Sequence, residues 1–87
     1  MRTHYEIMIR DTEKRATRAM KTQNLQIGSP YYGAFVMPNG VYMQKHALYC
    51  IADIAAVYLC EDSQYYHDEK MLTSMLIGLD YVRAQQH

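Results

Sequence analysis

The stretch that decides the fold reads HALYCIADIAAVYLC, from His46 to Cys60 in a chain of 87 residues. Between Ala47 and Cys60 the only charged residue is Asp53. A helix that is apolar on nearly every side belongs in an interior. This one is too short and too interrupted for a transmembrane span, which needs about 18 or more apolar residues. We therefore predict a buried second helix from about Tyr42 to Cys60.

A first helix is predicted upstream, from about His4 to Gln23. Thr3 and Glu6 stand at capping-box spacing, in which each side chain satisfies a free N–H of the first turn. One face is apolar at helical spacing; it comprises Tyr5, Met8, Ile9, Ala16, Ala19 and Met20. On the charged opposite face, Glu6 with Arg10 and Asp11 with Arg15 form (i, i+4) pairs.

A third helix is predicted downstream of a short turn, and it begins near Asp68 and Glu69, which suit a first turn. Its main apolar face comprises Met71, Leu72, Met75, Leu76, Leu79 and Val82, and Ile77, Tyr81 and Ala84 widen it. Because the turn is short, the second and third helices should pack as an antiparallel hairpin. The fold class is therefore all-α, with one helical unit over residues 1–87.

Residues 24–41 interrupt the helical pattern with glycine and proline. Met37-Pro38-Asn39-Gly40 is typical of a β-turn with proline at its second position. Residues 34–37 and 41–43 would then pair as a short β-hairpin, which stands as an alternative to an irregular loop. A connection this long in a compact helical domain is often functional.

Charge and cysteine content restrict the classes of function. The formal net charge is zero, so no global charge draws the chain to nucleic acid or to an anionic membrane. Residues 1–23 nevertheless carry a net +3 and the remainder −3. Residues 1–20 contain no apolar signal-peptide core, which argues against secretion by that route. Cys50 and Cys60 would lie about 15 Å apart on one helix, beyond disulfide reach, so reduced thiols and a cytoplasmic location are expected.

The apolar surface exceeds what three short helices can cover. The second helix is apolar on nearly every side, and the third is apolar on two sides. Either the chain forms a homo-oligomer, or it is the opening part of a larger helical protein whose later helices cover that surface. In both interpretations Ile77 and Tyr81, at the edge of the third helix, should be covered by something beyond these three helices.

Asp53 is the candidate buried polar residue. A carboxylate in an apolar helix must be paired, hydrogen-bonded or neutralised, so we expect a hydrogen bond or an ion pair with a loop or another helix; a catalytic or ligand-binding role is the alternative. His46 and Cys50 share a helix face at (i, i+4). No second ligand pair accompanies them, so we predict no metal site, and no cofactor is expected either.

The candidate substrate-binding residues surround the start of the second helix: Tyr31, Tyr32, Asn39 and His46, with Lys45 nearby. Free backbone N–H groups point outward at a helix start. Aromatic faces with amide and hydroxyl donors suit a polar, ring-shaped ligand such as a sugar. The same residues equally suit a loop folded onto its own core. No catalytic residue can be assigned.

Part of the chain, roughly residues 28–87, resembles a helical hairpin of the (α/α) toroid proteins. The resemblance lies in the run from His46 to Leu59, in Tyr65-Tyr66, and in the ending Tyr81-Val-Arg-Ala-Gln-Gln-His87. Toroid proteins include heparinase II/III-like polysaccharide lyases and unsaturated glucuronyl hydrolases. The resemblance implies that the chain is the first part of such a ring. It also implies that loops at one end of the helices line a sugar cleft.

Two functions are therefore expected as alternatives. The first is the N-terminal part of a carbohydrate-active toroid protein that binds or acts on polysaccharides of the uronic-acid type, with little or no catalysis by these residues alone. The second is a small helical module for protein–protein interaction or homo-oligomerisation. Oligosaccharide, further helices or a second copy are the expected partners; nucleic acid and membrane are not.

Overall fold

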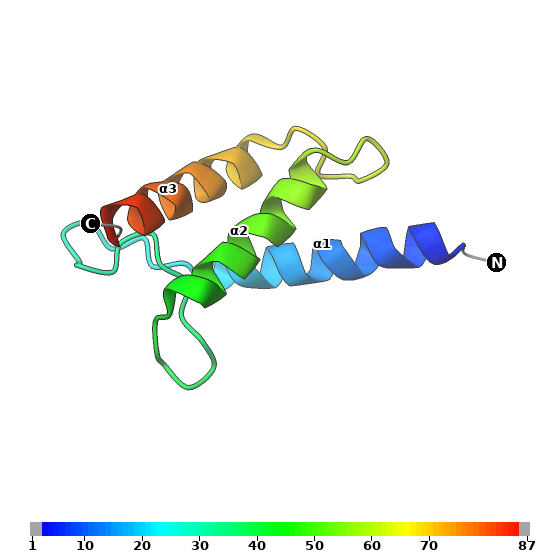
Figure 1. The fold of residues 1–87 in the computed structure, drawn as a ribbon. Helices are drawn as coiled ribbons and strands as arrows, with labels where there is room; N and C mark the ends of the chain where they lie inside the picture. The colour runs from blue at the N-terminus through cyan, green and yellow to red at the C-terminus, as the bar shows by residue number, and fades with distance from the viewer. Residues whose placement is uncertain (1–2, 86–87) are drawn as a thin grey trace.

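The computed structural model describes residues 3–85, and they form three α-helices. These are α1 (His4–Thr22), α2 (Gln44–Tyr58) and α3 (Glu69–Gln85). α2 packs against both α1 and α3, and α3 runs back alongside α2 (Figure 1). The predicted all-α class, the long first helix and the antiparallel hairpin are confirmed. The Gln86–His87 ending, which carries part of the toroid resemblance, lies outside the described residues.

Side-chain caps begin two of the helices. Thr3 Oγ1 accepts a hydrogen bond from the Glu6 N–H at 3.1 Å, as the capping spacing predicted. Asp68 Oδ1 accepts from the N–H groups of Lys70, at 2.8 Å, and Met71, at 3.1 Å. Asp68 therefore precedes α3 and caps it rather than forming part of its first turn. Within residues 3–85, no helix is long and apolar enough to cross a lipid bilayer.

The core lies where one face of α2 meets its two neighbours. That face consists of Ala47, Cys50, Ile51, Ile54 and Val57. It is covered by Ala16 and Ala19 of α1, by Met71 and Val82 of α3, and by Phe35 from the long loop. Gly78 permits the close approach of α3, because a Cβ there would lie only 3.1 Å from both Ile51 and Phe35. Phe35 is therefore a core residue, whereas Tyr31 and Tyr32 of the same loop are exposed.

The outer face of α2 is exposed, so the prediction of a helix buried on every side is wrong for that face. Leu48, Tyr49, Ala52 and Ala56 face outward, and Leu59 follows them just beyond the helix. Hydropathy predicts that an apolar helix will be buried, but two neighbouring helices can cover only part of its circumference. The toroid and oligomer interpretations both require something else to cover this face.

The buried face of α3 also differs from the predicted one. Ser74 and Gly78 are buried, while Leu76 and Leu79 are exposed. Ile77 and Tyr81, predicted to need cover from elsewhere, are half-buried against Gly33 of the long loop. Small residues lie in the interface because α2 and Phe35 approach α3 closely at Gly78. Leu76 and Leu79 lie outside this interface and remain exposed.

The long loop folds mainly through turns. Gly40 N donates to Met37 O at 2.8 Å, which closes the predicted β-turn. Val36 and Tyr42 form one isolated antiparallel bridge, and Gln23 with Phe35 forms another. Since the pairing does not extend further, the residues that the structure describes contain no β-strand, and the β-hairpin alternative reduces to a single bridge.

Candidate functional site

The loop between α1 and α2, which carries Tyr31, Tyr32 and Asn39, lies at the end of the α2–α3 hairpin where α2 begins and α3 ends (Figure 1). His46, the fourth predicted sugar-binding residue, is in the first turn of α2. These four residues do not form a single site there. Tyr31 stacks on Tyr42, with ring centroids 4.5 Å apart and planes 9° apart. Asn39 Oδ1 accepts from the Val41 N–H at 3.1 Å, which stabilises its own turn. Tyr31 and Asn39 thus both make contacts within the loop.

Tyr32 lines a pocket of about 260 Å³ between the loop and the last turns of α3. The other lining residues are Pro30, Ile77, Asp80, Tyr81, Ala84 and Gln85. Burial raises the pKa of Tyr81, and the nearby hydroxyl groups of Tyr31 and Tyr42 raise it further. Tyr81 is therefore neutral at physiological pH. This pocket combines two tyrosine rings with a carboxylate and an amide.

His46 lines a different and larger pocket of about 520 Å³, between α1, residues 36–38 and the first half of α2. Arg15 and Arg18 of α1 also line it, as do Tyr49, Cys50 and Asp53 of α2. Sequence reasoning missed the two arginines as site residues. Both lie on the charged side of α1, which periodicity alone places away from the core, and only the packing of α1 on α2 brings them opposite His46 and Asp53.

Asp53 forms an ion pair with another helix, as expected for a carboxylate in an apolar helix. Arg15 Nε lies 3.4 Å from both carboxylate oxygens of Asp53, a long distance for a charge-assisted hydrogen bond. The Asp53 side chain is 28% exposed, so it is less buried than the sequence predicted. Arg15 makes this pair in place of the predicted one with Asp11.

His46 and Cys50 are in contact, as their spacing predicted, with Nε2 and Sγ 3.5 Å apart. Burial raises the pKa of the Cys50 thiol, and the charge of Asp53 raises it further. The thiol is therefore protonated at neutral pH, which disfavours both nucleophilic attack and metal ligation. Among residues 3–85 there is no cluster of three or more metal-ligating side chains.

A buried carboxylate that sequence reasoning missed joins α1 to the α2–α3 turn. Glu13 Oε2 accepts from Ser63 Oγ at 2.6 Å and from Gln64 N at 3.2 Å, while Oε1 accepts from Arg10 at 2.7 Å. Burial acts to raise the pKa of Glu13, but these hydrogen bonds outweigh it and the pKa is lowered. Its position on the apolar stripe, between Ile9 and Ala16, was the available signal.

A second buried polar contact joins the end of α1 to α3. Gln23 Nε2 donates to the backbone oxygens of Ser74, at 2.9 Å, and Gly33, at 3.2 Å. Ser74 Oγ donates to Gln23 Oε1 at 2.6 Å. Both the Glu13 contacts and the Gln23–Ser74 contacts are structural, because within residues 3–85 no buried side-chain N or O atom lacks a hydrogen-bond partner.

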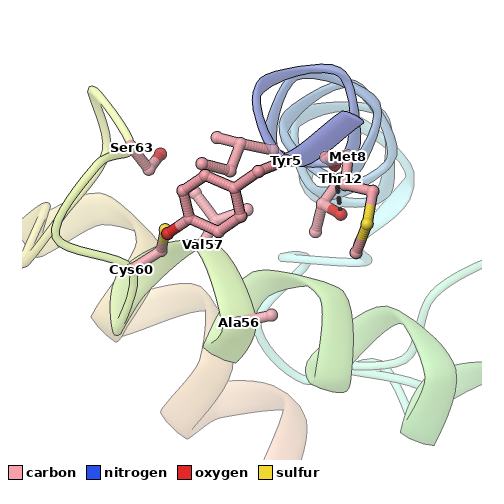
Figure 2. A pocket seen from close by; sticks show the side chains of 8 residues that line it. Tyr5, Met8, Thr12, Ala56, Val57, Cys60 and Ser63 are labelled. Atoms are coloured by element: carbon pink, nitrogen blue, oxygen red, sulfur yellow. Dashed lines mark hydrogen bonds between the residues drawn. The ribbon is translucent and has the colours of Figure 1, made fainter. Parts of the chain in front are cut away.

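An apolar groove lies between the first half of α1 and the last turns of α2 (Figure 2). Tyr5, Met8 and Thr12 line one side, and Ala56, Val57 and Cys60 the other. The groove has a volume of about 130 Å³. It offers room for one apolar side chain and has no arrangement suited to catalysis.

Comparison of the chain with protein-family models, with curated proteins and with solved structures found no match. The likeness to (α/α) toroid proteins therefore rests on the residue pattern from His46 onward.

Proposed function

We propose that this chain forms the first helices of a carbohydrate-active (α/α) toroid protein that binds or acts on polysaccharides of the uronic-acid type. The observation that carries the proposal is that Tyr31 and Tyr32 of the long loop lie at one end of the antiparallel α2–α3 hairpin. Tyr31 stacks on Tyr42 just before α2, and Tyr32 lines the pocket against the last turns of α3. Toroid proteins bind sugar with loops at one end of their helices. As part of the same proposal, the protein is located in the cytoplasm, as expected from two cysteines in the reduced state.

The chemistry of the Tyr32 pocket supports a sugar ligand. Tyrosine rings pack against the C–H faces of a sugar ring while their hydroxyl groups bond at the edge. Asp80 and Gln85 add an acceptor and an amide, which suit vicinal hydroxyl groups. The exposed outer face of α2 and the exposed Leu76 and Leu79 of α3 suit cover by later helices of a ring.

Titration with glucuronic-acid and galacturonic-acid oligosaccharides, followed by amide NMR shifts, tests the proposal. We expect shifts around Tyr32 and Tyr81, and several-fold weaker binding in Tyr32→Ala. Tyr66→Ala is the matched control, because Tyr66 is 40% exposed, close to the 37% of Tyr32, and lies in the turn at the other end of the hairpin. Absence of binding, or equal loss in both variants, would count against a sugar site here.

The second candidate function is a helical interaction module, and a specific observation favours it. Tyr5 and Met8 leave an apolar surface exposed on the first half of α1, where both line the groove of Figure 2. A homo-oligomer would bury such surface, as it would bury Leu76 and Leu79 of α3.

Solution mass by light scattering distinguishes the two functions. A defined dimer that Leu76→Asp dissociates would favour the interaction module. Leu76→Asp is a cleaner variant than Ile77→Asp, because Ile77 packs against Gly33 within the chain. A monomer that binds oligosaccharide at Tyr32 would favour the toroid function.

A further inference from the structure

The pocket between α1 and α2 has the size and the lining of a small-molecule site. Its volume of about 520 Å³ lies in the range of ligand pockets, roughly 300–1,000 Å³. Its walls are largely apolar, formed by Ala19, Val36, Met37, Pro38 and Tyr49. Its charged groups are Arg15, Arg18 and Asp53. Such a lining suits a ligand that has an apolar body and one charged group.

The charges in this pocket favour an anion. Arg15 and Asp53 face each other at 3.4 Å and largely offset one another. The ion pairs found among residues 3–85 are Arg10–Glu13 and Arg15–Asp53, so the guanidinium of Arg18 is not committed to a carboxylate in that range. The formal charge of the lining is therefore +1 with His46 neutral, from two arginines and one aspartate.

A guanidinium group suits a carboxylate more than it suits most other anions of unit charge. Its planar fork of N–H donors matches the two carboxylate oxygens in a bidentate arrangement. Tyr49 contributes an exposed aromatic ring to the same lining, and Pro38 contributes an apolar ring from the loop. Both are surfaces on which a flat or ring-shaped body can pack.

We propose that this pocket binds a small carboxylate-bearing molecule with a ring-shaped body. The carboxylate bonds to the Arg18 guanidinium, and the ring packs against Tyr49 and Pro38. Arg15 stays with Asp53 and screens the ligand from that negative charge. The inference goes beyond the proposed function, because the lining shares no residue with the Tyr32 pocket.

The carboxylate ligand could be an aromatic acid or a sugar acid, and benzoate and glucuronate are the probes for these two classes. Each is titrated into the 87-residue chain, and binding is followed by amide NMR shifts. Methyl benzoate, which has the ring without the charge, is the matched probe. Arg18→Gln should weaken carboxylate binding about tenfold or more, the usual effect of losing a charge-assisted hydrogen bond. Lys21→Gln removes the same charge from an exposed position on α1 outside the pocket, and should leave binding within about twofold, since exposed charges are screened.

Asp53→Asn sharpens the assignment, because it removes the negative charge and releases Arg15. We expect tighter carboxylate binding in this variant; weaker binding would mean that Asp53 itself holds the ligand, and would overturn the arrangement. No binding of either carboxylate, methyl benzoate binding as well as benzoate, or an unchanged affinity in Arg18→Gln would each overturn the proposal. Tighter binding of glucuronate than of benzoate identifies a sugar acid as the source, and the reverse identifies an aromatic acid.

The outcome is independent of the proposed sugar function. Loss of binding in Arg18→Gln with shifts near Tyr49 reports on this pocket, whereas loss in Tyr32→Ala reports on the other. Arg18 is exposed, so its replacement should leave the fold intact, and an unchanged circular dichroism spectrum verifies this. The two variants therefore show separately whether a ligand binds in the Arg18 pocket and whether one binds in the Tyr32 pocket.

Discussion

The two halves of α1 have the same amphipathic sequence pattern but very different surroundings. In the second half, Glu13, Ala16 and Ala19 are buried against α2 and the turn that follows it. In the first half, Tyr5 is 54% and Met8 is 65% exposed, although both belong to the predicted apolar stripe. Figure 1 shows the reason: α1 crosses α2, and its first turns extend past it.

The difference shows that apolar periodicity identifies the apolar face of a helix, but not which part of that face is buried by another element. Side chains at helical spacing share a face wherever a helix forms. Which part of that face becomes buried depends on where the partner helix crosses it. The second half of α1 is therefore expected to determine stability, and the first half to be available for partners. The following substitutions test that division.

Phe35→Ala should have the largest effect, because Phe35 packs with Ala16 and Ala19 in the core next to the second half of α1. Truncating a fully buried phenylalanine removes apolar burial and leaves a cavity, at a cost of about 3–5 kcal/mol. Met8→Ala in the exposed first half should change the free energy of unfolding by less than about 1 kcal/mol. Urea denaturation measures both; equal losses would contradict the division.

Glu13→Ala should have the next largest effect. It leaves Ser63 Oγ and the Gln64 N–H without their acceptor, and an unsatisfied buried group costs about 1–3 kcal/mol. Asp11→Ala is the control, since Asp11 is an exposed carboxylate two positions away, and it should cost less than about 0.5 kcal/mol. A loss no greater than that of the control would show that the Glu13 contacts contribute little.

The stabilisation that the Glu13 carboxylate contributes should also depend on pH. The pKa of Glu13 in the folded chain is below its ordinary value of 4.5, so its contribution is complete above pH 4.5 and is lost as the pH falls through the lowered pKa. Glu13→Gln should therefore be less stable than the wild type at neutral pH, and the gap should narrow below pH 4.5. Thermal unfolding at a series of pH values measures it; a gap that widens in acid would refute the assignment.

Asp62→Asn, which removes the carboxylate partner of Tyr5 at the exposed end of α1, should have the smallest effect on stability. The Tyr5 hydroxyl donates to Asp62 at 2.8 Å, and this hydrogen bond is the main cause that raises the pKa of Tyr5 to about 12. The contribution of this hydrogen bond to the stability of the fold is present below the ordinary pKa of 10 and is lost as the pH rises through about 12. In an ultraviolet titration, Asp62→Asn should return this pKa towards 10, with little change in melting temperature at neutral pH.

Much of the fold could be predicted from local patterns. Thr3 caps α1, residues 37–40 form the expected turn, and the three helices lie within a few residues of their predicted ends. These features depend on contacts between residues close in the chain, which a sequence displays directly. The (i, i+4) contact between His46 and Cys50 belongs to the same class.

The candidate sites could be predicted only in part. Tyr31, Tyr32, Asn39 and His46 come to one end of the hairpin, but Tyr32 and His46 line separate pockets. Arg18 joins the lining with His46 only because α1 crosses α2. Local spacing cannot place two helices relative to each other when a long loop joins them.

By itself, the sequence determined the three helices, the turn, and the need for a partner at Asp53. Capping, periodicity and the cost of an isolated carboxylate act at short range or on one residue alone, and this is why they can be read along the chain. Only the tertiary structure decided that Arg15 is that partner, that Glu13 is buried, and that Leu76 and Leu79 are exposed. Those outcomes depend on the crossing of α1 and on the close approach at Gly78, which arise when distant surfaces pack together.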